Sequence, residues 1–140
     1  MLKKLAALAG TLAVAGGFAL AAPGAASADR SDCPSGAFCA WYLASYDGTM
    51  YHKYVNGTWP EPVKNDDRSW YNHGTYDPGA DVIKVYDANG SDSVTLCIKR
   101  GASGHVDGEA DDHQDMVRAM DRGNYHRWVG GCSSGDPVLD

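Results

Sequence analysis

Apolar and polar residues alternate along several short stretches of the chain, which is the pattern of β-strands with one face buried in a core. The first stretch covers residues 38–43, where even-numbered and odd-numbered side chains would point to opposite sides. Residues 49–55 are rich in strand formers and should return antiparallel to the first stretch across a turn at residues 45–48. This pattern predicts the start of a β-sandwich.

The clearest expected hairpin joins residues 81–86 to residues 93–99. An Asn-Gly dipeptide at positions 89–90 lies between them, and this dipeptide is the strongest short signal for a two-residue hairpin turn. With these two residues in the turn, Val85 faces Val94 and the apolar side chains of both strands share one face. We therefore predict a hairpin with one buried and one exposed or half-covered face.

The character of the chain changes after the second strand of this hairpin. Residues 101–115 are polar and acidic, which predicts a long loop. One short helix should follow around residues 116–120, whose apolar side chains share a helical face. A last strand is expected at Tyr125, Trp128 and Val129. Candidate caps of the helix are Asp111 or Asp112 at its start and Gly123 at its end.

Residues 1–28 have the layout of a secretory signal peptide. Lys3 and Lys4 form a positive n-region, an Ala- and Leu-rich apolar run follows, and residues 26–28 form a small-residue cleavage site. A transmembrane anchor is the alternative, but the run is rich in Ala and Gly and no cluster of positive charges follows it. We therefore expect a secreted, extracellular protein whose mature chain begins near Asp29.

The mature chain should form a single domain over residues 29–132, followed by a flexible tail over residues 133–140. Removing 28 of the 140 residues leaves 112, and losing two lysines takes the formal charge from −6 to −8. This acidic balance disfavours nucleic acid as a partner, because phosphates would repel the chain. It equally disfavours adhesion to an anionic membrane after signal removal, and we expect a well-solvated monomer.

Four cysteines in an exported chain of this size predict two disulfides. Three pairings are possible. A zinc site is the competing interpretation, but zinc-binding cysteines commonly occur as CxxC pairs and the chain contains none. The cysteines are Cys33, Cys39, Cys97 and Cys132.

Residues 33–48, CPSGAFCAWYLASYDG, carry the most specific motif. Two cysteines bracket a Pro-Ser-Gly turn, and Trp41, Tyr46 and Gly48 follow with the spacing aromatic-x4-aromatic-x-Gly. In this spacing a tight turn lets one ring cover the other, while the glycine takes a backbone conformation closed to residues with a Cβ. The motif resembles the opening of peptidase inhibitor family I36, the Streptomyces metalloproteinase-inhibitor type, and the similarity continues loosely to about Gly101.

The resemblance implies an all-β fold, a Greek-key β-sandwich of βγ-crystallin type, here with one short helix in the C-terminal part and two disulfides. It also favours one of the three cysteine pairings. Cys33 and Cys39 are close in sequence and match the family opening, which leaves Cys97 to pair with Cys132.

The sequence Asn-Asp-Asp-Arg-Ser at residues 65–69 resembles the calcium motif of βγ-crystallins, in which paired Asn or Asp residues precede Ser or Thr and a further Ser. Oxygen donors at this spacing suit Ca²⁺, although Trp70 stands where the further serine is expected. The alternative is a turn in which these side chains bond the local backbone. No cofactor is required, and the candidate Ca²⁺ ligands are Asn65, Asp66, Asp67 and Ser69.

The resemblance implies a secreted protease as partner, with thermolysin-like metalloproteases first. A loop held in a substrate-like shape binds a protease without losing much conformational freedom. These enzymes favour a large aliphatic residue just after the scissile bond, so Cys97 and Ile98 form the candidate inhibitory loop, anchored by a disulfide. The alternation also places Ile98 on the buried face with Leu96, so a core position is the alternative. Glycine-rich residues 101–108 are another candidate contact surface.

Two other classes of function compete with inhibition. A calcium-stabilised binding module would use exposed Trp59, Trp70 and nearby tyrosines to hold a carbohydrate or cell-wall ligand. An enzyme would need an activated nucleophile, but the four cysteines are more simply explained as disulfides than as reactive thiols. The acidic segment at residues 107–112 does not follow the EF-hand pattern, and His105 and His113 lack the spacing of a helical metal-binding pair. We therefore expect no catalytic residues.

Overall fold

The computed structural model describes residues 28–87, 93–108 and 113–140. The expected signal peptide at residues 1–28 therefore lies almost wholly outside the described residues, as does the expected Asn-Gly turn at residues 89–90. Asp111 and Asp112, the candidate helix caps, also lie outside them. Among the described residues, every helix is too short or too polar to cross a membrane.

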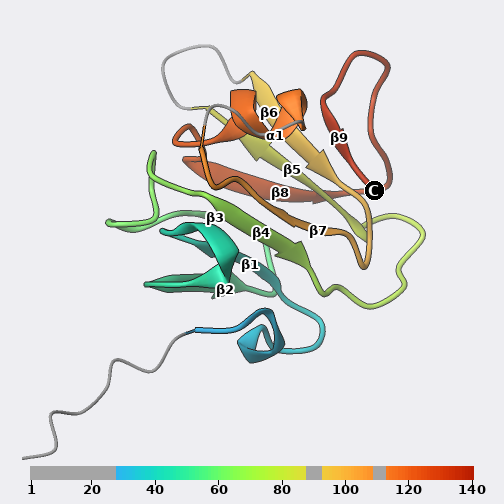
Figure 1. Ribbon diagram of the computed structural model, residues 1–140. Coiled ribbons are helices and arrows are strands. Elements are labelled where there is room, and N and C mark those ends of the chain that lie inside the picture. The colour runs from blue at the N-terminus through green and yellow to red at the C-terminus, as the bar shows by residue number, and fades with distance from the viewer. Residues whose placement is uncertain (1–27, 88–92, 109–112) are drawn as a thin grey trace, which may run out of the picture.

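The described chain forms two β-sheets and little helix (Figure 1). The four-stranded sheet has the order β2-β1-β4-β7, and the five-stranded sheet has the order β3-β8-β5-β6-β9. Neighbouring strands are antiparallel except β6 and β9, which are parallel. The first sheet contains β1 (Phe38–Trp41), β2 (Met50–Lys53), β4 (Ser69–Asn72) and β7 (Ser103–His105). The second contains β3 (Gly57–Thr58), β5 (Val82–Tyr86), β6 (Val94–Ile98), β8 (Tyr125–Val129) and β9 (Val138–Leu139).

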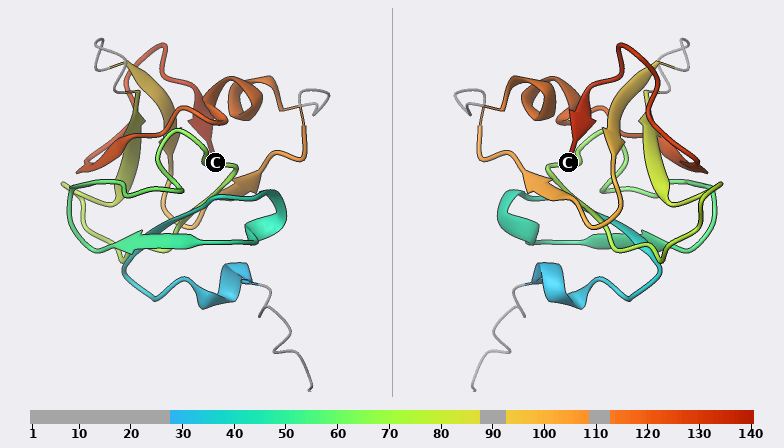
Figure 2. Two further views of the ribbon diagram at one scale, coloured as in Figure 1. Left: turned by 90° about the vertical axis from the view of Figure 1, so that its left-hand side faces the viewer. Right: turned by 90° about the vertical axis from the view of Figure 1, so that its right-hand side faces the viewer.

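Three short helical segments accompany the sheets. The 3₁₀ turns η1 (Arg30–Asp32) and η2 (Ala44–Tyr46) belong to the N-terminal half, and α1 (Gln114–Ala119) is the expected short helix. Figure 2 shows η1 and α1 on opposite sides of the molecule. Met116 and Ala119 of α1 are buried, so the helix covers the core with the apolar face that the sequence predicts. Its N-cap position is held by His113.

The main core lies between the two sheets. It is built from alternate side chains of the central strands, including Phe38 of β1, Val85 of β5 and Leu96 of β6, all fully buried. The opposite face of β1 is buried as well, because the N-terminal segment packs over Cys39 and Trp41 in a second, smaller core. Both faces of β1 are therefore buried, which agrees with the apolar side chains on each of them.

The aromatic-glycine motif folds as predicted. The rings of Trp41 and Tyr46 lie with centroids 5.3 Å apart at an interplanar angle of 82°, so one ring covers the edge of the other. Gly48 has φ +76°, in the left-handed region that residues with a Cβ rarely adopt. Both predicted disulfides are present, Cys33–Cys39 and Cys97–Cys132. The βγ-crystallin topology stays a prediction.

The β5–β6 hairpin exists, but its predicted register is wrong. Val85 pairs with Leu96 instead of Val94, and the register is interrupted by a bulge between Val85 and Tyr86. Residues 83–85 are thus paired two residues away from their predicted partners, whereas beyond the bulge Tyr86 pairs with Val94, one residue away from the predicted Ser93. Because side chains alternate with a period of two, the displacement by two leaves the side chains of residues 83–85 opposite partners of the predicted face.

Four strands, β3 at residues 57–58 among them, fall where the sequence predicts no regular structure. β4 overlaps the calcium-like motif, β7 lies in the expected long loop at residues 101–115, and β9 lies in the expected flexible tail at residues 133–140. Each is two to four residues long and is held by strands far away in sequence. Local alternation over so few residues is too weak to predict a strand.

Candidate functional site

The candidate inhibitory residues Cys97 and Ile98 lie in the core. Both have no exposed surface, and β6 is flanked by β5 on one side and β9 on the other. The backbone N–H of Cys97 donates to the carbonyl oxygen of Pro137 at 2.7 Å, and that of Lys99 donates to Leu139 at 2.9 Å. In this conformation neither residue can reach a protease, and Ile98 occupies the core position given by its alternation with Leu96.

The C-terminal segment that covers β6 is held by charge as well as by pairing. The ammonium group of Lys84 lies 2.8 Å from the carboxylate of Asp136, and both side chains are only 11% exposed. Lys99 makes a second, exposed ion pair with Asp140. Burial opposes ionisation of Asp136, yet its pKa lies below the usual value because Lys84 and the Ser133 backbone donate hydrogen bonds to it.

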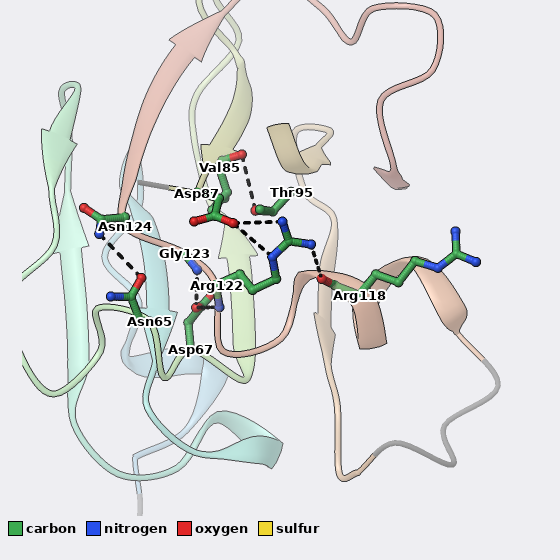
Figure 3. A network of polar contacts seen from close by, with 9 residues as sticks. All are labelled: Asn65, Asp67, Val85, Asp87, Thr95, Arg118, Arg122, Gly123 and Asn124. Carbon is green, nitrogen blue, oxygen red and sulfur yellow. Dashed lines mark hydrogen bonds and ion pairs between the residues drawn. The ribbon is translucent and has the colours of Figure 1, made fainter. Parts of the chain in front are cut away.

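Asp67, from the calcium-like motif, is a fully buried carboxylate whose two oxygens accept hydrogen bonds from N–H groups. Figure 3 shows it beside Arg122 and Gly123. Its Oδ2 accepts from the indole N–H of Trp70 at 2.6 Å. Its Oδ1 accepts from the backbone N–H of Gly123 at 2.6 Å and of Arg122 at 3.2 Å. Burial raises the pKa of Asp67 to about 7, although these donated bonds act in the opposite direction.

The other residues of that motif point to different partners. The hydroxyl of Ser69 donates to the carbonyl of Leu43 and accepts from the backbone N–H of Tyr46. Asn65 accepts from the side chain of Asn124, and Asp66 is exposed. The described part of the chain contains no group of three His, Cys, Asp or Glu side chains that could hold a metal ion. The motif joins β4 to residues 121–124 as a structural turn.

Arg122 extends this polar network to the five-stranded sheet (Figure 3). Its guanidinium donates to the carboxylate of Asp87 through Nε at 3.2 Å and Nη2 at 2.8 Å, and through Nη1 to the carbonyl of Arg118. Asp87 is almost fully buried, so the pair is partly shielded from water. The network fixes the segment that leads from α1 into β8.

β8 carries the one buried histidine of the described core, His126, and this residue holds a surface loop from beneath. Its Nδ1 accepts from the indole N–H of Trp59 at 3.0 Å, so its Nε2 carries the proton and donates to the carbonyl of Val55, also at 3.0 Å. Burial lowers the pKa of His126 to about 4, which keeps the ring neutral at neutral pH. The neutral tautomer satisfies both contacts at once.

The loop at residues 54–56 connects β2 of one sheet to β3 of the other. Tyr54 is 57% exposed and Val55 is 64% exposed, although the Val55 carbonyl is fixed from inside. The side chain of Asn56 accepts from the backbone N–H of Trp128 at 2.7 Å. The loop is therefore tied to β8 at two consecutive residues while its side chains face solvent.

A hollow of about 400 Å³ lies beside this loop. Residues 54–56 and Gly36 line it together with Thr75, Asp77, Ala80 and, from β8, Trp128. Tyr76, which lies between Thr75 and Asp77 in the sequence, is 70% exposed. This end of the sandwich thus presents exposed aromatic and aliphatic side chains next to a concave surface. By contrast, Trp59 and Trp70 are buried, so the expectation that they form an exposed ligand platform is wrong.

No sequence motif marks the loop at residues 54–56. Val55 and His126 lie 71 residues apart in sequence, and neither belongs to a recognisable functional pattern. The only available signal is the exposed-looking Tyr54-Val55 pair at the end of a predicted strand, just before Asn-Gly. Such a signal is weak, because single exposed apolar residues are common on protein surfaces.

Comparison with known proteins identifies one family. The model of peptidase inhibitor family I36 matches residues 26–97, which is half of the chain. Neither the curated proteins nor the solved structures provide a significant match. The matched region includes both cysteines of the opening motif, the loop at residues 54–56 and the β5–β6 hairpin up to Cys97.

Proposed function

The chain belongs to peptidase inhibitor family I36, and on this basis we propose that it is a secreted inhibitor of extracellular metalloproteases that blocks the active site with a rigid loop. Membership of the family indicates an inhibitor and not an enzyme, with a protease as its partner. The family match is the observation that carries the proposal. Secretion is supported by the signal-like residues 1–28 and by two disulfides, which persist in oxidising compartments.

Blocking by a rigid loop is supported by the way the surface is built. Binding is tighter when the contact segment already has its bound shape, because less conformational freedom is lost in the complex. The loop at residues 54–56 meets this requirement through its two bonds to β8. Metalloproteases are proposed as the first class because the opening motif resembles the metalloproteinase-inhibitor type of the family.

The test is inhibition of a panel of extracellular proteases by the chain from Asp29 with both disulfides formed. The panel contains a thermolysin-like, a subtilisin-like and a trypsin-like enzyme, each assayed with a short peptide substrate. We expect stoichiometric inhibition of the thermolysin-like enzyme. Inhibition of a serine protease alone would contradict the metalloprotease target, and no inhibition at micromolar protein would contradict the inhibitor function in this chain.

The structure offers no support for a calcium-stabilised binding module. Both tryptophans on which it depends are buried, and the carboxylate of Asp67 is already occupied by three N–H donors. No observation in the described residues favours it over inhibition.

A further inference from the structure

β2 is an edge strand of the four-stranded sheet, with β1 on one side and no strand on the other among the described residues. The backbone N–H of Tyr42 donates to the carbonyl of Thr49, which makes this the first hydrogen-bonded pair of the β1–β2 ladder. Such pairs alternate along an antiparallel ladder, so Tyr51 and Lys53 also bond to β1. The backbone groups of Met50 and His52 therefore face the open edge.

This open edge leads directly into the exposed loop. His52 and Lys53 are exposed and are followed by Tyr54 and Val55, so four consecutive side chains are accessible. An extended segment with free backbone groups on one edge can pair with a strand of another protein, with side chains entering pockets of the partner. Residues 52–56 thus resemble a peptide substrate in an active site, because their side chains are exposed and one edge of their backbone is open, but they are held in place by the fold.

The bonds beneath the loop indicate how it would be used. The Val55 carbonyl points inward to His126, so it is not available to a partner, whereas the Val55 side chain points into solvent. Asn56 is tied to Trp128, and Gly57 pairs with His126 as part of the β3–β8 ladder. The segment is held on the C-terminal side of Val55 and is free for contact at Val55 and before it.

We propose that residues 52–56 form the segment that enters the active-site cleft of the target peptidase, and that the Val55 side chain fills an apolar subsite of the enzyme. This inference rests on the proposed function and adds the contact segment and the specificity-determining residue. The neighbouring hollow and the exposed loop around Tyr76 supply the further contact area that a stable complex needs.

Other exposed apolar residues are less suited to this role. Leu43 packs against the turn at Gly48, where a Cβ would lie 3.0 Å from its Cγ. Val138 lies in β9, which is paired to β6, and this residue is only 36% exposed. Val55 has the largest exposed fraction of the aliphatic side chains among the described residues, at 64%, and its backbone carbonyl is fixed by buried His126.

The experiment compares inhibition constants of Val55 variants against an enzyme that the wild-type chain inhibits. Val55→Ala should weaken inhibition by about tenfold and Val55→Asp by about a hundredfold or more, as expected for a residue central to an interface. Val55→Ile should retain inhibition, because it keeps an apolar side chain. Val138→Ala is the matched control and should change the constant by less than about twofold. Melting temperatures of all four variants establish that each is folded.

The outcomes separate this inference from the function on which it rests. If the wild-type chain inhibits a peptidase and folded Val55→Asp inhibits it equally well, the contact segment is elsewhere and this inference is overturned. If the wild-type chain inhibits no peptidase, the proposed function fails and the inference fails with it. Loss of inhibition in Val55→Asp with retention in Val55→Ile and Val138→Ala supports both.

Discussion

The imidazole Nε2 of His126 donates a hydrogen bond of 3.0 Å to the carbonyl oxygen of Val55, joining a fully buried ring to the most exposed part of a surface loop. The opposite ring nitrogen accepts from Trp59. The shape of the loop therefore depends on the core and on the neutral state of one side chain. This relationship connects the stability of the protein to the surface that we propose for inhibition.

Acid should weaken the folded state through His126. Its pKa is lowered from 6.5 to about 4, so between these values the unfolded chain binds a proton that the folded chain does not. The contribution of this residue to the free energy of unfolding is therefore fully present above about pH 6.5. It falls by about 3 kcal/mol as the pH is lowered towards 4. Protonated Nδ1 would also face the N–H of Trp59.

This effect is measured as the free energy of unfolding in denaturant at several values between pH 7.5 and pH 4, for the wild-type chain and for His126→Gln. The difference in stability between the two proteins should shrink as the pH falls, because the variant has no group that titrates in this range at position 126. A difference that stays constant over the whole range would show that His126 is not a buried neutral ring.

Replacement of Asp67 by alanine should destabilise the protein strongly. The substitution leaves the buried N–H groups of Trp70 and Gly123 without an acceptor, and each unsatisfied group costs about 1 to 3 kcal/mol. We expect a loss of about 3 kcal/mol or more in the free energy of unfolding. Asp66→Ala is the matched control, because Asp66 is exposed, and should change stability by less than about 0.5 kcal/mol. Equal effects of the two substitutions would contradict a buried structural role for Asp67.

A Cβ at Gly123 should not be tolerated. It would collide with the ring of Trp59 and lie too close to the carboxylate of Asp67, and neither group can move freely in the core. Overpacking of this kind costs about 1 to 3 kcal/mol, so Gly123→Ala should lower the melting temperature clearly. Gly131→Ala adds the same methyl group where no atom lies within 4 Å, and its melting temperature should stay close to that of the wild type. A Gly123→Ala protein as stable as Gly131→Ala would rule out this packing.

The two disulfides should differ in their contribution to stability. Cys97–Cys132 closes a loop with a sequence separation of 35, whereas Cys33–Cys39 closes one of 6. On the chain-entropy account, removing the first by paired alanine substitution costs about 4 kcal/mol, and removing the second costs about 2 kcal/mol. Denaturant unfolding of the two double variants tests this order. A larger loss for the Cys33–Cys39 pair would show that packing around the N-terminal turn outweighs loop entropy.

The sequence was most informative where the structure is set locally. β1 and β2 follow from alternation and from the turn that ends at Gly48, and the β5–β6 hairpin follows from its apolar face. The pairing of the hairpin could not be derived, because it is already displaced by one residue at Tyr86 and the bulge between Val85 and Tyr86 adds a second. Pairing of the cysteines was predicted correctly because two of them lie close together in the opening motif.

The surface proposed for inhibition could not be predicted in the same way. The loop at residues 54–56 takes its shape from His126 and Trp128, which come from a strand at the other end of the chain. Cys97 and Ile98 have the right chemistry for an inhibitory site, but β9 pairs with β6 and covers them. A strand of only two residues carries too short a pattern for this pairing to be predicted from the sequence. Exposure is decided by such tertiary contacts and not by residue type.

Competition for the active site of a thermolysin-like metalloprotease is the decisive test of whether this protein blocks the catalytic cleft. The enzyme is titrated with the disulfide-bonded chain in the presence of increasing concentrations of a small inhibitor that binds the catalytic metal. If residues 52–56 occupy the cleft, the two inhibitors exclude each other, and the apparent inhibition constant of the protein rises in proportion to the concentration of the small molecule. An apparent constant that does not change, with both inhibitors bound to one enzyme, would contradict the proposal that this protein blocks the active site.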